Sequence, residues 1–178
     1  MLLRRLAIPF NVVAPEIDET ARVDESPTDL VARLAFEKAD AICRQFPAAV
    51  VIGSDQLAVF DGKVLGKPGN HAAAFQQLQS CSGQSVEFLT SVVTSCHESG
   101  FSEHYTDYTR VNFRSLSDAE IERYLEMEKP YDCAGAFKAE SLGVVLFESI
   151  HSEDPTALIG LPLIRVAAML RRAGIRLP

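Results

Sequence analysis

The amino-acid sequence predicts a mixed α/β fold in which helices cover a sheet. Helical and β-rich segments alternate along the chain, which is typical of such layered folds. The composition, with 47% hydrophobic and 23% charged residues, is ordinary for a globular protein and sufficient for a sizeable core. A length of 178 residues suits one domain, or two lobes that share one sheet, so we expect residues 1–178 to form a single domain.

The N-terminal part of the chain predicts three elements. Residues 1–7 are expected to form a short helix with leucines on one side, and residues 8–14 are typical of a strand. Ser26 offers a hydroxyl cap to a following helix, and Pro27 suits the first position of that helix. We expect this helix to run to about Phe46, because apolar residues recur at helical spacing.

A short apolar, β-branched run at 48–52 predicts a strand buried on both faces. Four small or polar residues follow at 53–56, and the chain resumes as a strand over 57–60. Asp55 therefore stands where a buried strand is expected to end, and in open α/β sheets ligands gather at the carboxyl ends of strands. A carboxylate there can hold a divalent metal or take a proton from water, although an aspartate that caps a turn explains the pattern equally well.

The rest of the chain continues the alternation of helices and strands. The expected elements are a helix capped by Asn70 and running to about Ser80, β-rich segments over 86–96 and 105–113, a helix over 117–127 whose start carries a capping box, a polar loop over 132–141, a strand over 143–150 and a helix over 161–173. We expect the two β-rich segments to be antiparallel partners around a loop at Gly100.

The charge balance narrows the class of partner. The net charge is −7, whereas a protein that grips nucleic acid along its surface needs a basic face, so we expect no nucleic acid partner. A small phosphorylated ligand remains compatible, because a few lysines in a cleft can bind a triphosphate on an acidic protein.

Cysteine spacing and hydropathy indicate the compartment. The four cysteines form no CxxC pair and no zinc signature, so we expect reduced thiols in the core. No apolar run approaches the roughly 20 residues of a membrane span, and the start lacks the apolar region of a signal peptide. We therefore expect a cytoplasmic protein without a membrane partner.

Further residues suit phosphate and metal binding. Lys67 stands between a flexible glycine and a rigid proline and can reach phosphate as a point charge, although a solvated loop lysine is the simpler explanation. Lys38 falls near the apolar stripe of its helix, so its ammonium can emerge at a cleft edge. Asp18 and Glu19 lie in a loop and can join Asp55 around Mg²⁺, which is usually held by one or two carboxylates plus substrate phosphates.

Glu140 precedes a predicted strand and can accept hydrogen bonds from the edge of a guanine base. The four histidines have no metal spacing, and we expect them at the surface. The sequence contains no Walker loop, GxGxxG or GxSxG, which removes the kinases, dehydrogenases and serine hydrolases that carry these motifs. These local patterns alone leave the function open.

Short motifs occur in a characteristic order along nearly the whole chain. They include Ile8-Pro9-Phe10, Pro15-Glu16-Ile17-Asp18-Glu19, Glu37-Lys38-Ala39, Ile52-Gly53-Ser54-Asp55-Gln56, Gly66-Lys67-Pro68, Val111-Asn112-Phe113-Arg114, Cys133-Ala134-Gly135-Ala136-Phe137 and Ile159-Gly160-Leu161-Pro162-Leu163. Each motif is weak alone, but together they resemble the Maf family of nucleotide pyrophosphatases.

The resemblance implies a fold, an activity and a set of site residues. The fold would be an elongated, inosine-triphosphatase-like mixed sheet flanked by helices, with two lobes, a central cleft and often a homodimer. The activity would be hydrolysis of a nucleoside triphosphate between its α and β phosphates, with Mg²⁺ or Mn²⁺ as the metal. Asp55 matches the aspartate that accepts a proton from the attacking water. Lys38 and Lys67 match lysines that contact the phosphates, and Glu19 matches an acidic residue of the same cleft that can share the metal with Asp55.

The resemblance also suggests a substrate. Many Maf proteins carry threonine after the catalytic aspartate and glutamine in the later loop, and favour dTTP and UTP. This chain has Gln56 and Glu140 at those positions, which looks like the branch that prefers 7-methyl-GTP. We therefore expect Gln56 and Glu140 to bind the substrate, with Glu140 accepting from the N–H donors of the methylated guanine.

One motif of the family is missing. The family begins with a strand and a Ser-x-Ser-x-x-Arg-Arg phosphate-binding motif, whereas this chain opens inside the helix that follows. Arg4 and Arg5 lie about one to two helical turns too late to be those arginines. We expect either a wrongly assigned start or an N-terminally truncated chain with poor activity. Equal hydrolysis by this chain and by a version extended upstream would contradict the second expectation.

Two other functions stay open from the sequence. The first is a nucleotide-binding regulator that turns over weakly or not at all. The second is a house-cleaning pyrophosphatase for other non-canonical nucleotides, such as inosine or xanthosine triphosphate.

Overall fold

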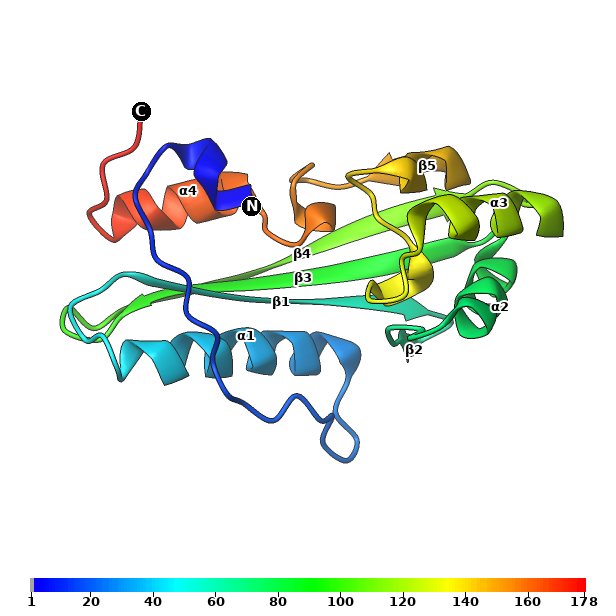
Figure 1. The fold of residues 1–178 in the computed structure, drawn as a ribbon. Coiled ribbons are helices and arrows are strands. Elements are labelled where there is room, and N and C mark those ends of the chain that lie inside the picture. Colours follow the sequence, from blue (N-terminus) through cyan, green and yellow to red (C-terminus); the bar gives the residue numbers. More distant parts are fainter. Residues whose placement is uncertain (1) are drawn as a thin grey trace. The chain divides into compact units, whose positions relative to one another are not determined.

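The computed structural model describes residues 2–178, and Met1, where the predicted N-terminal helix begins, lies outside the described residues. The α-helices and strands are α1 (Pro27–Cys43), β1 (Val51–Phe60), β2 (Lys63–Leu65), α2 (His71–Cys81), β3 (Ser85–Cys96), β4 (Phe101–Phe113), α3 (Asp118–Glu128), β5 (Phe147–His151) and α4 (Leu163–Arg172). Short 3₁₀ helices cover Leu2–Leu6, Ala134–Ala136, Leu142–Leu146 and Ala157–Ile159. The predicted mixed α/β fold is confirmed (Figure 1).

The strands form one sheet in the order β2-β1-β3-β4-β5. β1 pairs with β2 antiparallel over Ala58 to Phe60, and β4 pairs with β5 antiparallel over Arg110 to Phe113. The chain divides into two compact units. One consists of Met1–Gln56, Thr90–Asp107 and Asp154–Pro178, and the other of Leu57–Leu89 and Tyr108–Glu153.

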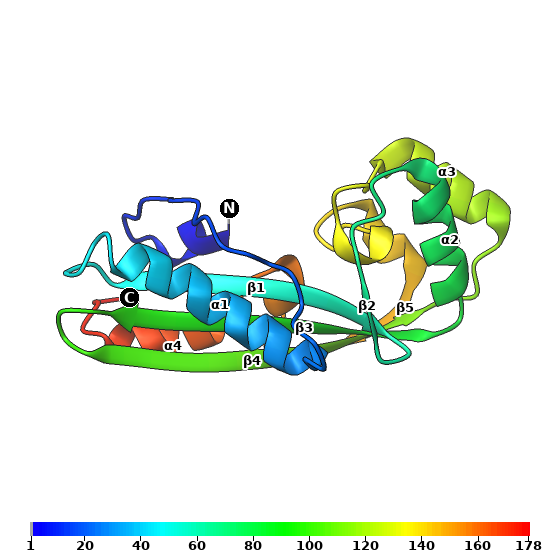
Figure 2. The same ribbon diagram turned by 90° about the horizontal axis from the view of Figure 1, so that it is seen from below.

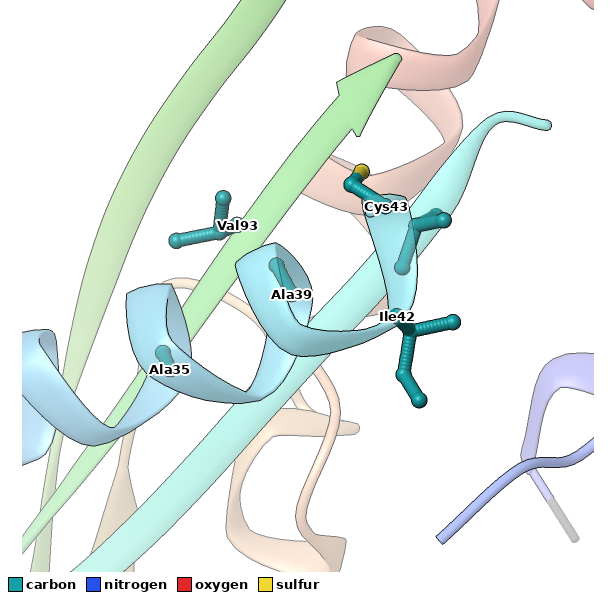
Figure 3. Packing of buried hydrophobic residues seen from close by; sticks show 6 residues of the cluster. Ala35, Ala39, Ile42, Cys43 and Val93 are labelled. Carbon is teal, nitrogen blue, oxygen red and sulfur yellow. The ribbon is translucent and has the colours of Figure 1, made fainter. Parts of the chain in front are cut away.

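In the first unit, α1 packs on one face of the sheet. The Ser26 hydroxyl accepts from the Asp29 N–H at 3.1 Å, so the predicted cap starts the helix. The inward side of α1 carries small and apolar residues, which form a buried cluster with β1 and β3 (Figure 3). Its members are Ala35, Ala39, Ile42, Cys43, Val51 and Val93. Helix α1 ends at Cys43, three residues before the predicted Phe46.

The opposite face of the same strands packs against α4. Val92 lies in a buried cluster with Val166, Met169 and Leu170 of α4, whereas the next residue, Val93, belongs to the cluster under α1. This alternation follows from strand geometry, in which successive side chains point to opposite faces. Figure 1 accordingly shows α1 and α4 on opposite sides of β1 and β3.

The second unit is built around two helices and a group of phenylalanines. α2 packs against α3, and the two helices lie side by side in Figure 2. The predicted capping box starts α3, because the Ser117 N–H donates to Glu120 Oε2 at 2.9 Å. The Asn70 side chain caps α2 by accepting from the Ala73 N–H. Edge-to-face ring contacts join Phe88, Phe113, Phe137 and Phe147.

The predicted strand over 8–14 is wrong. None of these residues lies in a strand, and the chain stays irregular up to the start of α1 apart from a turn near Asp24. Pro9 has no N–H to give to a sheet, and the Val12 and Val13 side chains are 67% and 41% exposed. Ile8 is half-buried against the α4 cluster, whereas residues 11–14 are exposed, so the apolar pattern does not continue as a sheet strand would require.

The predicted strand over 143–150 is only half right. Leu142–Leu146 forms a 3₁₀ helix, and the strand is Phe147–His151. The Gly143 N–H donates to the Lys138 carbonyl at 3.0 Å, and the backbones approach so closely that a Cβ at Gly143 would lie 2.4 Å from that oxygen. Glu128 also accepts from the Leu142 N–H. These contacts close a turn where the apolar pattern alone predicts a strand.

All four cysteines are free. Cys43, Cys81 and Cys96 are buried as predicted, whereas Cys133 is half-buried. No helix formed by residues 2–178 combines the length and hydropathy that a membrane crossing requires.

Candidate functional site

Asp55 lies in the middle of β1, so the prediction that it follows the end of a strand is wrong. The strand continues through Gly53, which packs tightly beneath α1. A Cβ at Gly53 would lie 2.5 Å from the Ala35 carbonyl oxygen and 2.6 Å from the Ala39 nitrogen. Gly53 thus marks a close approach of helix and strand, and not a loop.

That close approach brings Lys38 to Asp55. The Lys38 Nζ donates to Asp55 Oδ1 at 2.6 Å, and it also lies 2.7 Å from Glu19 Oε1. The side chains of Lys38 and Asp55 are 20% and 12% exposed, whereas Glu19 is 61% exposed. One ammonium therefore joins a half-buried carboxylate of the sheet to a carboxylate of the N-terminal loop.

The electrostatics of this group keep Lys38 charged. Burial alone would lower the pKa of Lys38, but its hydrogen bonds and charge attraction to Asp55 and Glu19 outweigh burial and raise the pKa above its ordinary value. The ammonium thus stays positive at neutral pH.

Arg33 fixes the loop that carries Glu19, a role that the sequence analysis did not assign. Its guanidinium binds both carboxylate oxygens of Glu25 at 2.6 and 2.9 Å, Glu37 at 3.0 Å and the Thr20 carbonyl at 3.0 Å. Arg33 and Glu25 are only 12% and 8% exposed. The spacing of Arg33 and Glu37, four residues apart on a helix, was the one signal in the sequence.

On the other face of β1, the neighbours of Asp55 bind the backbone of residues 157–160. The Ser54 hydroxyl donates to the carbonyls of Ser91 at 2.8 Å and Gly160 at 3.2 Å. The Gln56 amide nitrogen donates to Thr90 Oγ1 at 2.8 Å and to the Ala157 carbonyl at 2.9 Å. Gln56 and Asp55 are adjacent in sequence, yet strand alternation points their side chains to opposite faces.

Asp154 shapes the start of the 157–160 segment. It is 1% exposed, and its Oδ1 accepts from the Thr156 N–H and hydroxyl at 3.0 and 2.7 Å. Its Oδ2 accepts from the Ile164 N–H at 2.6 Å, at the first turn of α4. The segment that meets Ser54 and Gln56 is thus anchored by a buried carboxylate.

Lys67 and Glu140 belong to the second unit, where both are exposed on loops. The Gly69 N–H donates to the Tyr131 carbonyl at 2.9 Å, which joins the loop of Lys67 to the loop after α3. The pKa of Asp132 in that second loop is lowered, first by its own backbone N–H and then by the Cys133 thiol, with smaller contributions from nearby lysines that include Lys67.

The carboxylates of Glu19 and Asp55 fit a hard divalent cation in part. Both present oxygen ligands within hydrogen-bond distance of one ammonium, so both can reach one ion. Among residues 2–178 no three His, Cys, Asp or Glu side chains are placed to hold a metal. An ion at Glu19 and Asp55 would therefore draw its remaining ligands from phosphate oxygens and water, as Mg²⁺ usually does.

Comparisons with known proteins agree with the motif order. The family model described as Maf-like protein matches residues 1–173. A protein of Albidiferax ferrireducens named 7-methyl-GTP pyrophosphatase is 56% identical over 175 residues, which are 98% of this chain and 88% of that protein. Proteins of the same name in Polaromonas sp. and Xanthomonas axonopodis pv. citri are 53% and 52% identical, over 99% of this chain and 80% and 92% of their own lengths.

Proposed function

The chain belongs to the Maf family, and from this premise we propose that it is a nucleotide pyrophosphatase that hydrolyses the bond between the α and β phosphates of a nucleoside triphosphate. The observation that carries the proposal is the Lys38 ammonium held between Asp55 and Glu19. It places a candidate base next to a candidate phosphate ligand, which hydrolysis of a phosphoanhydride requires.

In this proposal Asp55 accepts a proton from the attacking water. The water oxygen bonds to the α phosphorus. The bond from that phosphorus to the α–β bridging oxygen breaks, and pyrophosphate leaves with the electron pair of that bond. Lys38 holds Asp55 in place and offsets negative charge on the phosphate oxygens. A positioned general base of this kind contributes about 10²–10⁴ in rate.

We propose that Glu19 and Asp55 also hold the metal. When bound, Mg²⁺ or Mn²⁺ would supply Lewis-acid polarisation of the phosphate oxygens. Lys67, exposed on its loop, suits a further phosphate contact as a point charge.

The proposed substrate is 7-methyl-GTP, after the names of the similar proteins. The exposed carboxylate of Glu140 supports this choice, because a guanine base presents two adjacent N–H donors that a carboxylate accepts. The positive charge of the methylated ring would strengthen that contact.

The partners and compartment are proposed on the same basis. The net charge of −7 supports a nucleotide and not a nucleic acid as partner. The free cysteines suit a reducing compartment, so we propose the cytoplasm, and a homodimer follows from the family resemblance alone.

Pyrophosphate release from 7-methyl-GTP with Mg²⁺ or Mn²⁺ tests the proposal. Asp55→Asn should lower kcat about 10²–10⁴-fold, since Asn cannot accept the proton. Asp40→Asn is the matched control, because Asp40 is an exposed aspartate of α1 paired with Arg44, and it should retain full activity.

The outcomes separate the alternatives. Binding of 7-methyl-GTP by the wild type without release of pyrophosphate would support a regulator that does not turn over. A kcat/KM for inosine triphosphate above that for 7-methyl-GTP would support the house-cleaning activity instead. Release that is unchanged in Asp55→Asn would remove Asp55 from the chemistry.

A further inference from the structure

Glu128 is the last residue of α3, a position that is unfavourable for its carboxylate in two ways. The side chain is only 11% exposed, and the dipole of a helix disfavours a negative charge at its C-terminal end. Burial alone would raise the pKa of Glu128, but the hydrogen bonds that it accepts and the charge of Lys138 outweigh burial and lower the pKa. The carboxylate is therefore ionised at neutral pH, and its contacts offset both costs.

Those contacts lie in the turn that carries Glu140. Glu128 Oε2 accepts from the Ser141 hydroxyl at 2.8 Å and from the Leu142 N–H at 3.0 Å. Glu128 Oε1 lies 3.7 Å from the Lys138 Nζ. Hydrogen bonds to an ionised acceptor are stronger than those between neutral groups. One carboxylate thus binds the two residues that follow Glu140 and attracts the ammonium of a residue before it.

A second side chain of α3 holds the same turn. Tyr124, one helical turn before Glu128, is buried, and its hydroxyl oxygen accepts from the Lys138 N–H at 3.2 Å. The Lys138 carbonyl accepts in turn from the N–H groups of Ser141 and Gly143, at 3.3 and 3.0 Å. The turn is therefore closed on itself and bonded at both ends to one face of α3.

The side chain of Glu140 itself is exposed at this turn. If the turn were mobile, its ordering on contact with a ligand would lower the affinity, whereas a turn that is already ordered avoids that cost. We propose that Glu128 is a positioning residue for substrate choice: by binding the turn after Glu140, it keeps the Glu140 carboxylate in place for the edge of the guanine base. The proposal rests on the proposed function, which gives Glu140 its role.

Glu128→Met tests this, because methionine keeps the length of the side chain and removes both acceptor oxygens. We expect the preference for 7-methyl-GTP over GTP, as the ratio of kcat/KM, to fall about twofold to fivefold through KM, because ordering the turn then adds to the cost of binding. The kcat should stay near the wild-type value. A merely structural role would lower the rate with both nucleotides alike and leave the preference unchanged. Glu126→Met, at an exposed glutamate of α3, is the matched control and should keep all constants.

A double variant shows whether Glu128 acts through Glu140. If it does, Glu128→Met should leave the preference unchanged in a Glu140→Ala background, since the contact with the base is already lost. An equal fall in both backgrounds would overturn the proposal, as would an unchanged preference in Glu128→Met alone. Glu128→Gln keeps one acceptor oxygen and should show a smaller fall of the same kind, so it carries the test if Glu128→Met does not fold.

A second measurement needs no turnover. Amide exchange over 138–143 should become faster in Glu128→Met and not in Glu126→Met. The ratio of the Kd values for 7-methyl-GTP and GTP, measured by titration calorimetry, should move toward one in Glu128→Met alone. If the wild type releases no pyrophosphate, the proposed function fails, but these two readouts still decide the role of Glu128. An unchanged ratio of Kd values, with or without faster exchange, would refute the positioning role.

Discussion

The proposed site residues of the two units differ in how they are held. In the first unit, Lys38 and Asp55 stand on a helix and a strand that pack against each other, and they are 20% and 12% exposed. In the second unit, Lys67 and Glu140 are exposed on loops. A carboxylate that takes part in a reaction must be held in one orientation, whereas a residue that only contacts the ligand can lie on a loop. We therefore expect changes in the first unit to alter turnover or folding, and changes in the second unit to alter substrate binding.

Gly53→Ala tests the packing of the first unit and should have the largest effect. The new Cβ would lie 2.5 Å from the Ala35 carbonyl oxygen, so α1 or β1 must shift. Overpacking of this kind costs about 1–3 kcal/mol or more in the free energy of unfolding, measured by urea denaturation. Gly66→Ala is the control, because a Cβ there meets open space. A Gly53→Ala variant as stable as the wild type would mean that α1 does not pack closely against β1 at this position.

Arg33→Met tests whether Arg33 holds the N-terminal loop so that Glu19 stays next to Lys38. Arg33 binds the carbonyl of Thr20, the residue after Glu19, so its loss should free Glu19 from Lys38. We expect kcat/KM to fall about tenfold in the pyrophosphate assay, since loss of orientation costs this much or more. Arg44→Met is the control, because Arg44 caps the C-terminal end of the same helix and its side chain is 74% exposed. Equal activity of the two variants would show that the loop is held without Arg33.

The same contact predicts behaviour in acid. The Arg33 guanidinium, with the Arg22 N–H, lowers the pKa of Glu25 from 4.5 to about 2. A depressed carboxyl pKa contributes stability that is complete above the unfolded pKa and is lost as the pH falls through the folded one. The loop should thus stay attached at pH 5 and loosen between about pH 4.5 and 2. Amide exchange over residues 18–25 measures this, and Glu25→Gln should show the loosened pattern already at pH 7.

The sequence predicted the regular parts of this fold better than the direction of its site residues. Ser26, Asn70 and Ser117 start helices as expected, because a cap is a local interaction. Residues 53–56 did not end a strand. The glycine at position 53 allows close packing against α1, which an earlier part of the chain forms. Local sequence cannot show that approach.

The site shows the same limit. Glu19, Lys38 and Asp55 were expected together and do meet. Gln56 was expected to bind the substrate, which stays a prediction. Its amide nitrogen bonds to residues 157–158, about 100 positions further on, and only the fold brings them to β1. The role of Arg33 likewise depends on the path of an irregular loop.

Lys67→Met tests whether an exposed loop residue of the second unit affects substrate binding without affecting turnover. If Lys67 contacts phosphate as an exposed charge, its removal should raise KM about three- to tenfold and leave kcat within about twofold, because a contact equal in ground and transition states affects binding alone. Lys63→Met removes an exposed lysine of β2 in the same unit and should change neither constant. A fall in kcat with constant KM would mean that Lys67 acts on the chemical step, as proposed for Lys38 and Asp55.

Glu140→Gln should have the smallest effect, confined to the choice between nucleotides. Glutamine keeps the shape and one acceptor oxygen but loses the charge, so one of the two hydrogen bonds to a guanine edge is lost along with the attraction to the methylated ring. We expect the preference for 7-methyl-GTP over GTP to fall about threefold to fivefold, which is about 0.6–1 kcal/mol and lies within the typical net value of one hydrogen bond. Glu126→Gln, an exposed glutamate of α3, should keep the wild-type preference. If the preference survives in Glu140→Gln, recognition of the methylated base lies elsewhere in the chain.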